Sequence, residues 1–97
     1  MNTVSAEKNN TAYLSCSGEY SSFTFRDKTV SFLTGHNLLT YTDIKLWDNG
    51  YLVVMCLNRD GSEEEDYIDL LPILDNLYMD KDEFLAPISE VKIRNVR

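Results

Sequence analysis

Hydrophobic and polar residues alternate along most of the chain from residue 11 onward, which is the spacing of a β-strand. The first three segments with this spacing are Thr11 to Cys16, Ser22 to Arg26 and Thr29 to Leu33. Phe23 and Phe25 fall on one side of the second segment. The pattern therefore predicts a hairpin over residues 22–33 with its aromatic side buried, followed by a loop at Gly35-His36-Asn37.

The middle of the chain predicts a second group of strands. They are Thr42 to Trp47, Tyr51 to Leu57 and Glu64 to Leu70. Asn49-Gly50 separates the first two, and this pair is the strongest local hairpin signal because both residues tolerate positive φ. The run from Tyr51 is apolar on both sides, which is typical of a central strand that is covered on each side. In the third segment we expect Tyr67 and Ile68 to enter the core.

Helical spacing replaces the alternation after Pro72, whose fixed φ suits a first helical turn. One apolar stripe is expected from Ile73, Leu74, Leu77 and Tyr78. Asp80 with Glu83 predicts the capped start of a second, one-turn helix. A last strand is expected from Ile88 to Val96. The order indicates an α+β fold: a mainly antiparallel sheet of about six or seven short strands, with two short helices between the last two strands.

The chain is short and acidic, which limits its organisation and its partners. Its 97 residues carry a net charge of −7. We expect a flexible N-terminal arm at residues 1–10 and a single domain at 11–97. The charge disfavours direct contact with nucleic acid or an anionic membrane. No apolar leader or membrane-length segment is present, so we expect a cytoplasmic protein.

The residues that usually carry catalysis are scarce. His36 is the only histidine, and the two cysteines, Cys16 and Cys56, lie far apart in apolar runs. Phosphate-binding, dinucleotide and nucleophile-elbow motifs are absent. We therefore expect no enzyme activity, no catalytic residues, no metal and no cofactor. Whether the two cysteines form a disulfide is left open.

The acidic residues are unevenly distributed. Ten of the 16 lie between Asp60 and Glu83, where only Lys81 opposes them. They are interpreted either as a solvated face that protects a strand edge or as a docking surface for a basic protein. A calcium site is disfavoured, because Asp60 to Glu65 lacks the ligand spacing of an EF-hand. The candidate contacts are Glu63, Glu64, Glu65, Asp66, Tyr67, Asp69, Asp80, Asp82 and Glu83. Docking requires that these carboxylates form one continuous outward face.

The aromatic residues offer a second, weaker indication of an interface. Tyr41, Trp47, Tyr51, Tyr67 and Tyr78 are candidate anchors. The alternative is that they complete a small core and keep their polar tips in water.

One segment resembles a known family. It comprises Asp43 to Val54, the turn at Gly61, Tyr67 to Leu74 and Phe84 to Ile93. Over residues 43–93 the chain is similar to domain-of-unknown-function family 2442 of small bacterial domains. The resemblance implies a small non-catalytic domain, sometimes found beside toxin-like genes, and it supplies no functional residues. The first 40 residues and the Glu63-Glu64-Glu65 run depart from the family pattern.

These observations lead to one main hypothesis and two alternatives. The main hypothesis is an antitoxin- or immunity-type module that neutralises a basic, nucleic-acid-acting protein by covering its substrate-binding surface. One alternative is a phage-type inhibitor of a host nucleic-acid enzyme. The other is a structural subunit that forms a homodimer or larger homo-oligomer through an edge strand and exposed tyrosines.

Overall fold

A computed structural model describes residues 10–94 of the chain. The strands are β1 (Thr11–Ser17), β2 (Tyr20–Phe25), β3 (Lys28–Leu33), β4 (Leu38–Asp48), β5 (Tyr51–Asn58), β6 (Glu63–Asp69) and β7 (Glu90–Ile93). The helices α2 (Leu71–Asn76) and α3 (Lys81–Leu85) lie between β6 and β7. The predicted α+β class, with two short helices between the last two strands, is confirmed.

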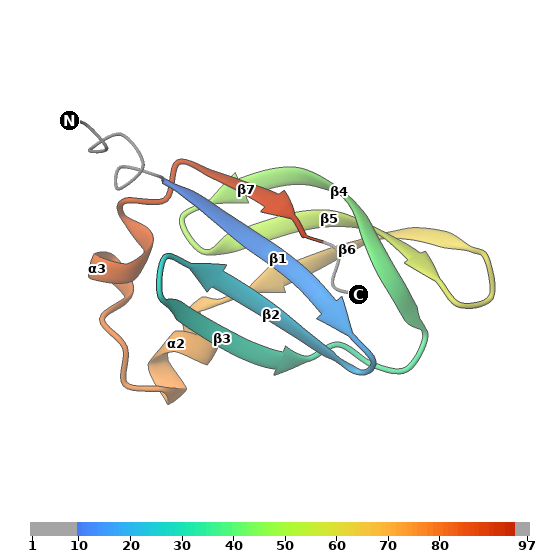
Figure 1. Cartoon of the computed structure of the whole chain (residues 1–97), viewed down its shortest axis with the longest axis horizontal. Helices are drawn as coiled ribbons and strands as arrows, with labels where there is room; N and C mark the ends of the chain where they lie inside the picture. Colours follow the sequence, from blue (N-terminus) through green and yellow to red (C-terminus); the bar gives the residue numbers. More distant parts are fainter. Residues whose placement is uncertain (1–9, 95–97) are drawn as a thin grey trace.

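The strands divide into two sheets. One has four strands in the order β3-β2-β1-β7, and the other has three in the order β4-β5-β6. All pairs are antiparallel except β1 with β7, which run parallel. β4 also contacts β7 and β1 of the other sheet, so the sheets meet along one side (Figure 1). The hydrophobic pattern predicted the strands correctly but not their division, because alternation marks a buried side without saying which sheet it belongs to.

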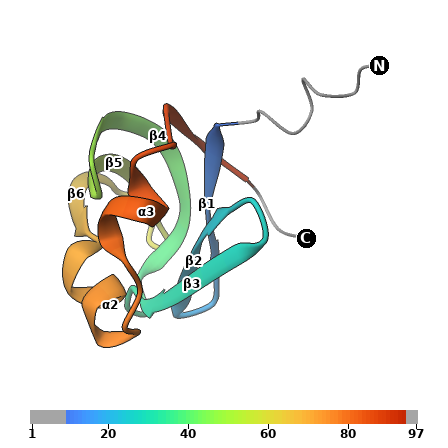
Figure 2. The same ribbon diagram turned by 90° about the vertical axis from the view of Figure 1, so that its left-hand side faces the viewer.

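The core lies between the two sheets. Phe23 at its centre stacks on Trp47 of β4, with ring centroids 5.5 Å apart, and meets Phe84 of α3 edge-on at 6.2 Å. Each sheet therefore buries one side against the other, and the helices fill the open end between them (Figure 2). The predicted central position is confirmed, since β5 lies between β4 and β6 and Leu52, Val54 and Cys56 are buried. The expected cover on each side is wrong, because the side of β5 that carries the exposed Tyr51 faces away from the other sheet.

Both helices begin where local chemistry predicts. Pro72 lies in the first turn of α2, and the Asp80 carboxylate accepts the backbone N–H of Glu83 at 3.2 Å to cap α3. The predicted apolar stripe on α2 is only partly correct, since Leu74 is buried but Leu77 and Tyr78 are exposed. The helix ends at Asn76 and the chain turns through Tyr78, whose φ is +56°. The last two residues of the stripe therefore lie outside the helix.

Two further expectations need correction. Tyr67, expected in the core, is 59% exposed, because it lies on the opposite side of β6 from the buried Ile68. The strand β4 begins at Leu38, four residues before the alternation suggested, since three register irregularities break its period of two.

The ends of the chain are described only in part. The predicted N-terminal arm lies outside the described residues except for Asn10, whose carbonyl accepts the backbone N–H of Ser89 at 2.9 Å. The last part of the predicted strand 88–96 likewise lies outside them. Within residues 10–94, no helix has the length and apolar character needed to cross a membrane.

Candidate functional site

The register of β5 with β6 decides where the acidic run points. Glu64 and Asp66 pair with the buried Cys56 and Val54, so their side chains lie on the side of the sheet that faces the core. Glu63, Glu65 and Asp69 alternate with them and lie on the other side. The acidic run of β6 is therefore divided between two faces of one sheet.

The second of these faces forms a surface that we call the outer face. It is the side of the three-stranded sheet turned away from the four-stranded sheet. Its residues are Thr40, Asp43, Leu46 and Asp48 on β4, Tyr51, Val53, Met55 and Leu57 on β5, and Glu63, Glu65, Tyr67 and Asp69 on β6. The helices lie at one end of the two sheets rather than over this face (Figures 1 and 2).

Apolar side chains run down the middle of the outer face. Val53 is nearly buried between its cross-strand neighbours Leu46 and Tyr67, which are 46% and 59% exposed. Tyr51 and Tyr67 stack with ring centroids 6.2 Å apart and an angle of 12° between the planes. Large aromatic rings held in place by stacking lose little entropy on binding, which is why tyrosine is enriched at the centre of interfaces.

Carboxylates flank this apolar stripe on both sides. Asp43 and Asp48 lie on the β4 side. Glu63, Glu65 and Asp69 lie on the β6 side. Within residues 10–94, ion pairs form between His36 and Glu19 and between Lys92 and Glu90, and neither reaches these strands. Lys45, in a register irregularity of β4, is the single cationic residue of the three strands. The outer face therefore has a strong negative charge that its own strands do not neutralise.

β6 forms the edge of its sheet, and two of its aspartates accept nearby backbone N–H groups. The Asp66 carboxylate accepts the N–H of Tyr67, a residue of the edge strand, at 2.8 Å. The Asp69 carboxylate accepts the N–H of Leu71, the first residue of α2, at 3.1 Å, and so belongs to the start of the helix. Asp66 alone therefore occupies a backbone group of the edge strand, and protection of the edge by the whole acidic run stays a prediction.

The inward carboxylates affect the buried thiol. Burial raises the pKa of Cys56 to about 11, and the nearby charges of Asp66 and Glu64 add to the effect. Both cysteines are free thiols. The Cys16 thiol donates to the backbone oxygen of Leu39 at 3.3 Å. A raised pKa keeps Cys56 protonated at neutral pH, which is the opposite of the activation that a nucleophilic cysteine needs.

The remaining acidic candidates lie away from the outer face. Asp80 caps α3, and Asp82 and Glu83 occupy its first turn. Asp60 is held in the β5–β6 turn, where its carboxylate accepts the Ser62 hydroxyl at 2.6 Å. The expectation of one continuous acidic face from Asp60 to Glu83 is therefore wrong, and the docking hypothesis in the form that required it is not supported. Alternation along β6 and the change of direction into the helices distribute the carboxylates over four regions: the two sides of β6, the β5–β6 turn and α3. An acidic interface would have to use the outer face, where the carboxylates of β6 are joined by Asp43 and Asp48 of β4.

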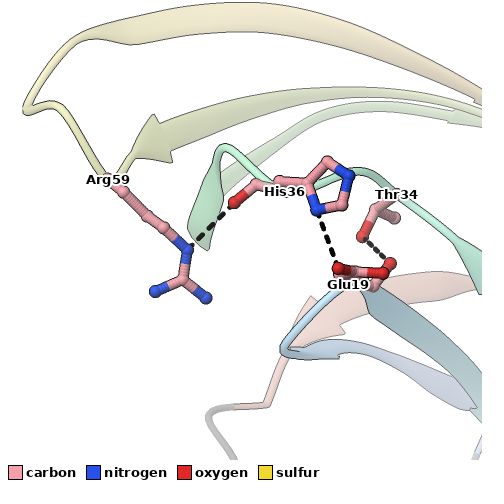
Figure 3. A network of polar contacts seen from close by, with 4 residues as sticks. All are labelled: Glu19, Thr34, His36 and Arg59. Atoms are coloured by element: carbon pink, nitrogen blue, oxygen red, sulfur yellow. Dashed lines mark hydrogen bonds and ion pairs between the residues drawn. The ribbon is translucent and has the colours of Figure 1, made fainter.

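The only histidine takes part in a network of polar contacts at the opposite end of the sheets from the helices. His36 Nδ1 lies 2.7 Å from the Glu19 carboxylate, and Arg59 Nε donates to the backbone oxygen of His36 at 3.0 Å. Thr34 donates its hydroxyl to the backbone oxygen of Glu19 at 3.0 Å. Figure 3 shows that these contacts join three turns from different parts of the chain. The network is exposed at His36 and Glu19, and its evident role is to hold the turns together.

The candidate aromatic anchors separate into two groups. Tyr41 is buried and Trp47 packs on Phe23, so these two belong to the core. Tyr51, Tyr67 and Tyr78 are exposed. Sequence reasoning missed Asp43, Leu46 and Asp48 as members of the site. Asp48 next to Tyr51 follows from the Asn49-Gly50 turn, but the other two depend on irregularities of β4 that have no clear sequence signal.

Metal coordination has no candidate in the described part of the chain. Residues 10–94 contain no group of three or more His, Cys, Asp or Glu side chains arranged to hold a metal ion.

Comparison with protein families gives one match, and it differs from the resemblance described above. The matching family is Domain of unknown function (DUF7724), over residues 10–96. Curated proteins and solved structures give no significant match. The assignment to family 2442 is therefore wrong. It depended on a hairpin turn, a helix-starting proline and a strand pattern, which many α+β domains require. It also left out residues 10–42, which the matching family includes. The chain belongs to the DUF7724 family of domains of unknown function.

Proposed function

We propose that this domain is a non-catalytic protein-interaction module that binds a basic protein through the outer face. The observation that supports the proposal most strongly is the arrangement of that face: an exposed apolar stripe containing the Tyr51–Tyr67 stack, flanked on both sides by carboxylates that form no ion pair within residues 10–94. An apolar centre with a charged rim is the usual organisation of a specific protein interface.

The two parts of the face have different physical roles. The stripe around Val53 supplies apolar area that is removed from water on binding, and this burial contributes most of the affinity. The rim carboxylates attract a basic partner over a distance of about 10 Å at moderate salt and so raise the association rate. Because the rim remains close to solvent, each ion pair contributes only about 0.5–1 kcal/mol.

A second copy of the chain is disfavoured as the occupant. A symmetric dimer formed through the outer face would bring the carboxylates of Asp43, Glu63 and Glu65 close to the same groups of the other copy. Like charges opposed across an interface are unfavourable. A partner rich in lysine and arginine relieves this repulsion, and the charge pattern therefore favours a different protein over self-association.

The more specific form of the proposal is an antitoxin- or immunity-type role. Lysine and arginine side chains cluster on proteins that bind nucleic acid, because they must neutralise phosphates. A carboxylate-rimmed face is complementary to such a surface and would compete with nucleic acid for it. We therefore propose a nucleic-acid-acting protein as the partner, neutralised when its substrate-binding surface is covered.

The arrangement of the reactive side chains supports a non-catalytic role. His36 is paired with Glu19 in an exposed network that joins turns. Cys56 is buried and its pKa is raised to about 11. The raised pKa leaves the Cys56 thiol unprepared as a nucleophile at neutral pH.

The test compares variants that remove negative charge from opposite faces of β6. The immobilised chain is exposed to a lysate of the source cell at about 50 mM salt and then washed with increasing salt. We expect retention of a basic protein, and the purified pair is used to measure affinity. A Glu63→Gln/Glu65→Gln variant should bind about 10-fold more weakly, since two rim ion pairs together contribute about 1–2 kcal/mol.

The matched control carries the same change in net charge on the other side of the same strand. A Glu64→Gln/Asp66→Asn variant should bind the partner nearly as tightly as the unmodified chain. Equal losses in both double variants would show that only net charge matters and would refute a face-specific role. Retention of no basic protein at low salt would refute the proposal as a whole. Inhibition of a nucleic-acid-cleaving or nucleic-acid-binding activity in the retained protein tests the neutralising role separately.

A further inference from the structure

A cleft of about 550 Å³ lies at the end of the molecule that holds the helices, away from the outer face. It is bounded by the β2–β3 turn on one side and by the segment from Tyr78 to α3 on the other. Phe25 and Phe84 form a buried floor and touch edge-on, with ring centroids 6.1 Å apart. The half-buried Met79 adds a sulfur atom to this apolar surface.

Two strained residues stand on opposite sides of this cleft. Arg26 and Tyr78 have φ of +58° and +56°, a region that costs residues other than glycine about 1 kcal/mol or more. Asn49 is the third such residue in the described chain, but it lies in an Asn-Gly hairpin turn, where this conformation is ordinary. Arg26 also lies in a two-residue hairpin turn and Tyr78 ends a helix, but arginine and tyrosine tolerate this φ less well than asparagine or glycine, and both residues border the same cleft. Strained backbone is concentrated at functional sites, because selection for function outweighs its cost.

Tyr78 is an unusual choice for its position. The Met79 N–H bonds to the Leu74 oxygen and the Tyr78 N–H to the Asp75 oxygen, which is the hydrogen-bond pattern that ends a helix with a left-handed residue. Glycine normally occupies that position. Tyr78 instead places an aromatic ring in solvent, where it is 97% exposed. Tyr78 thus combines a strained backbone conformation with an exposed aromatic ring.

The charges around the cleft specify the chemistry of its occupant. Arg26 is already engaged, since it donates to the Asn10 side chain at 3.0 Å and lies over the Phe25 ring. The carboxylates of Asp27 and Glu83 have no ion-pair partner within residues 10–94, and Lys28 is the remaining cation of the rim. Counting Asp80, which also caps α3, the lining carries three carboxylates against the two cations Arg26 and Lys28, so its net charge is negative and favours a cationic group.

We propose that this cleft binds a protein segment that presents an aromatic side chain beside a lysine or arginine. The aromatic ring would contact Phe84 and Met79 on the floor and pack beneath Tyr78. The cation would lie near Asp27 and Glu83. This proposal does not depend on the outer face, which lies on another part of the molecule.

The test uses three capped dipeptides followed by amide NMR of the full chain. They are acetyl-Trp-Lys-amide, acetyl-Trp-Glu-amide and acetyl-Ala-Lys-amide. We expect shift changes for the first, confined to residues 25–28 and 78–84, with an affinity at least about 5-fold above both others. Shift changes centred on another region, or equal binding of the lysine and glutamate peptides, would overturn the proposal.

A substitution at the strained residue provides an independent readout. Tyr78→Gly should raise the melting temperature by about 3 °C because the left-handed strain is removed, and should weaken acetyl-Trp-Lys-amide binding at least about 5-fold. Tyr20→Ala removes another exposed tyrosine, far from the cleft in β2, and should leave the peptide affinity unchanged. A lower melting temperature for Tyr78→Gly, or unchanged peptide affinity, would show that the ring serves the fold rather than binding. The Glu63→Gln/Glu65→Gln variant, which tests the outer face, leaves the cleft intact. Failure of that variant to bind the basic protein would therefore say nothing about peptide binding in the cleft.

Discussion

At the scale of single residues, polar groups in the core are tolerated only where they satisfy one another. Ser21 and Tyr41 are both buried, and their hydroxyls lie 2.7 Å apart, joining β2 of one sheet to β4 of the other. Within residues 10–94, every buried side-chain nitrogen or oxygen has a hydrogen-bond partner. The Ser21–Tyr41 pair therefore fixes how the two sheets lie against each other.

This pair gives a prediction that can be tested with a double-mutant cycle. Ser21→Ala leaves the Tyr41 hydroxyl buried and unsatisfied, which should lower the free energy of unfolding by about 1–3 kcal/mol. Adding Tyr41→Phe removes the hydroxyl that has lost its hydrogen-bond partner, so the double variant should be more stable than the single Ser21→Ala variant. Urea unfolding measures both values. Strictly additive losses would show that the two hydroxyls do not interact.

At the scale of elements, the hairpin between β4 and β5 is tied to both helices. Gly50 has φ of +104°, and a Cβ atom at this position would lie 3.0 Å from the Leu85 side chain and 3.1 Å from that of Leu71. The turn that the sequence predicts for backbone reasons is thus also a packing site for α2 and α3. Leu70 reinforces the contact by donating its N–H to the Gly50 oxygen at 2.8 Å.

Substitution of two glycines separates these contributions. Gly50→Ala should destabilise the domain by about 2–3 kcal/mol, because backbone strain and crowding of Leu71 and Leu85 add. Gly18→Ala is the control: its φ is also positive, at +65°, but a Cβ there meets nothing within 4 Å. It should cost about 1 kcal/mol. Equal losses in thermal unfolding would mean that the hairpin is not packed against the helices.

The elements also show which parts of the sequence pattern were informative. The Asn49-Gly50 turn, Pro72 and the Asp80 cap each depend on local chemistry, and each was predicted correctly. Tyr67 was predicted in the core and is exposed. The residues beside it in the sequence, Asp66 and Ile68, do not indicate which side of the strand is buried. That choice is made by the pairing of β6 with β5, where Tyr67 lies opposite Val53 on the outer face.

At the scale of the whole molecule, the two outward sheet faces differ in character. The four-stranded sheet carries mainly hydroxyl groups outward, with Ser15, Ser22 and Thr24 among them, and the basic Lys92 and Arg94 at the β7 side. The three-stranded sheet carries the apolar stripe and its carboxylates outward. In the described part of the chain, the outer face therefore carries Asp43, Asp48, Glu63, Glu65 and Asp69, and the helix end carries Asp80, Asp82 and Glu83. For the basic partner proposed above, this asymmetry would favour one orientation of approach.

The packing of the two sheets also predicts how stability depends on pH. Burial raises the pKa of Cys56 to about 11 from its ordinary value of 9.0, and burial likewise raises the pKa of Tyr41. As the pH rises above 9, the unfolded chain loses these protons while the folded chain keeps them. The unfolded state is therefore favoured, and the free energy of unfolding should decrease from about pH 9 towards pH 11.

A variant that lacks both groups tests this assignment. In Tyr41→Phe/Cys56→Ala, the decrease in unfolding free energy between pH 8 and pH 10.5 should be smaller than in the unmodified chain, whatever the variant's stability at pH 8. Urea unfolding at the two pH values provides the comparison. A decrease of the same size in both proteins would show that other groups cause the loss.

The sequence by itself determined most elements of this domain: where strands alternate, where a hairpin turns and where a helix begins. These depend on interactions within a few residues, so their signals are local. Only the tertiary structure decided the division into two sheets, the side of β6 on which each carboxylate lies, and the meeting of Arg26 and Tyr78 across one cleft. These features depend on strand register and on contacts between distant segments, and a shift of one residue in register would exchange the two faces of β6.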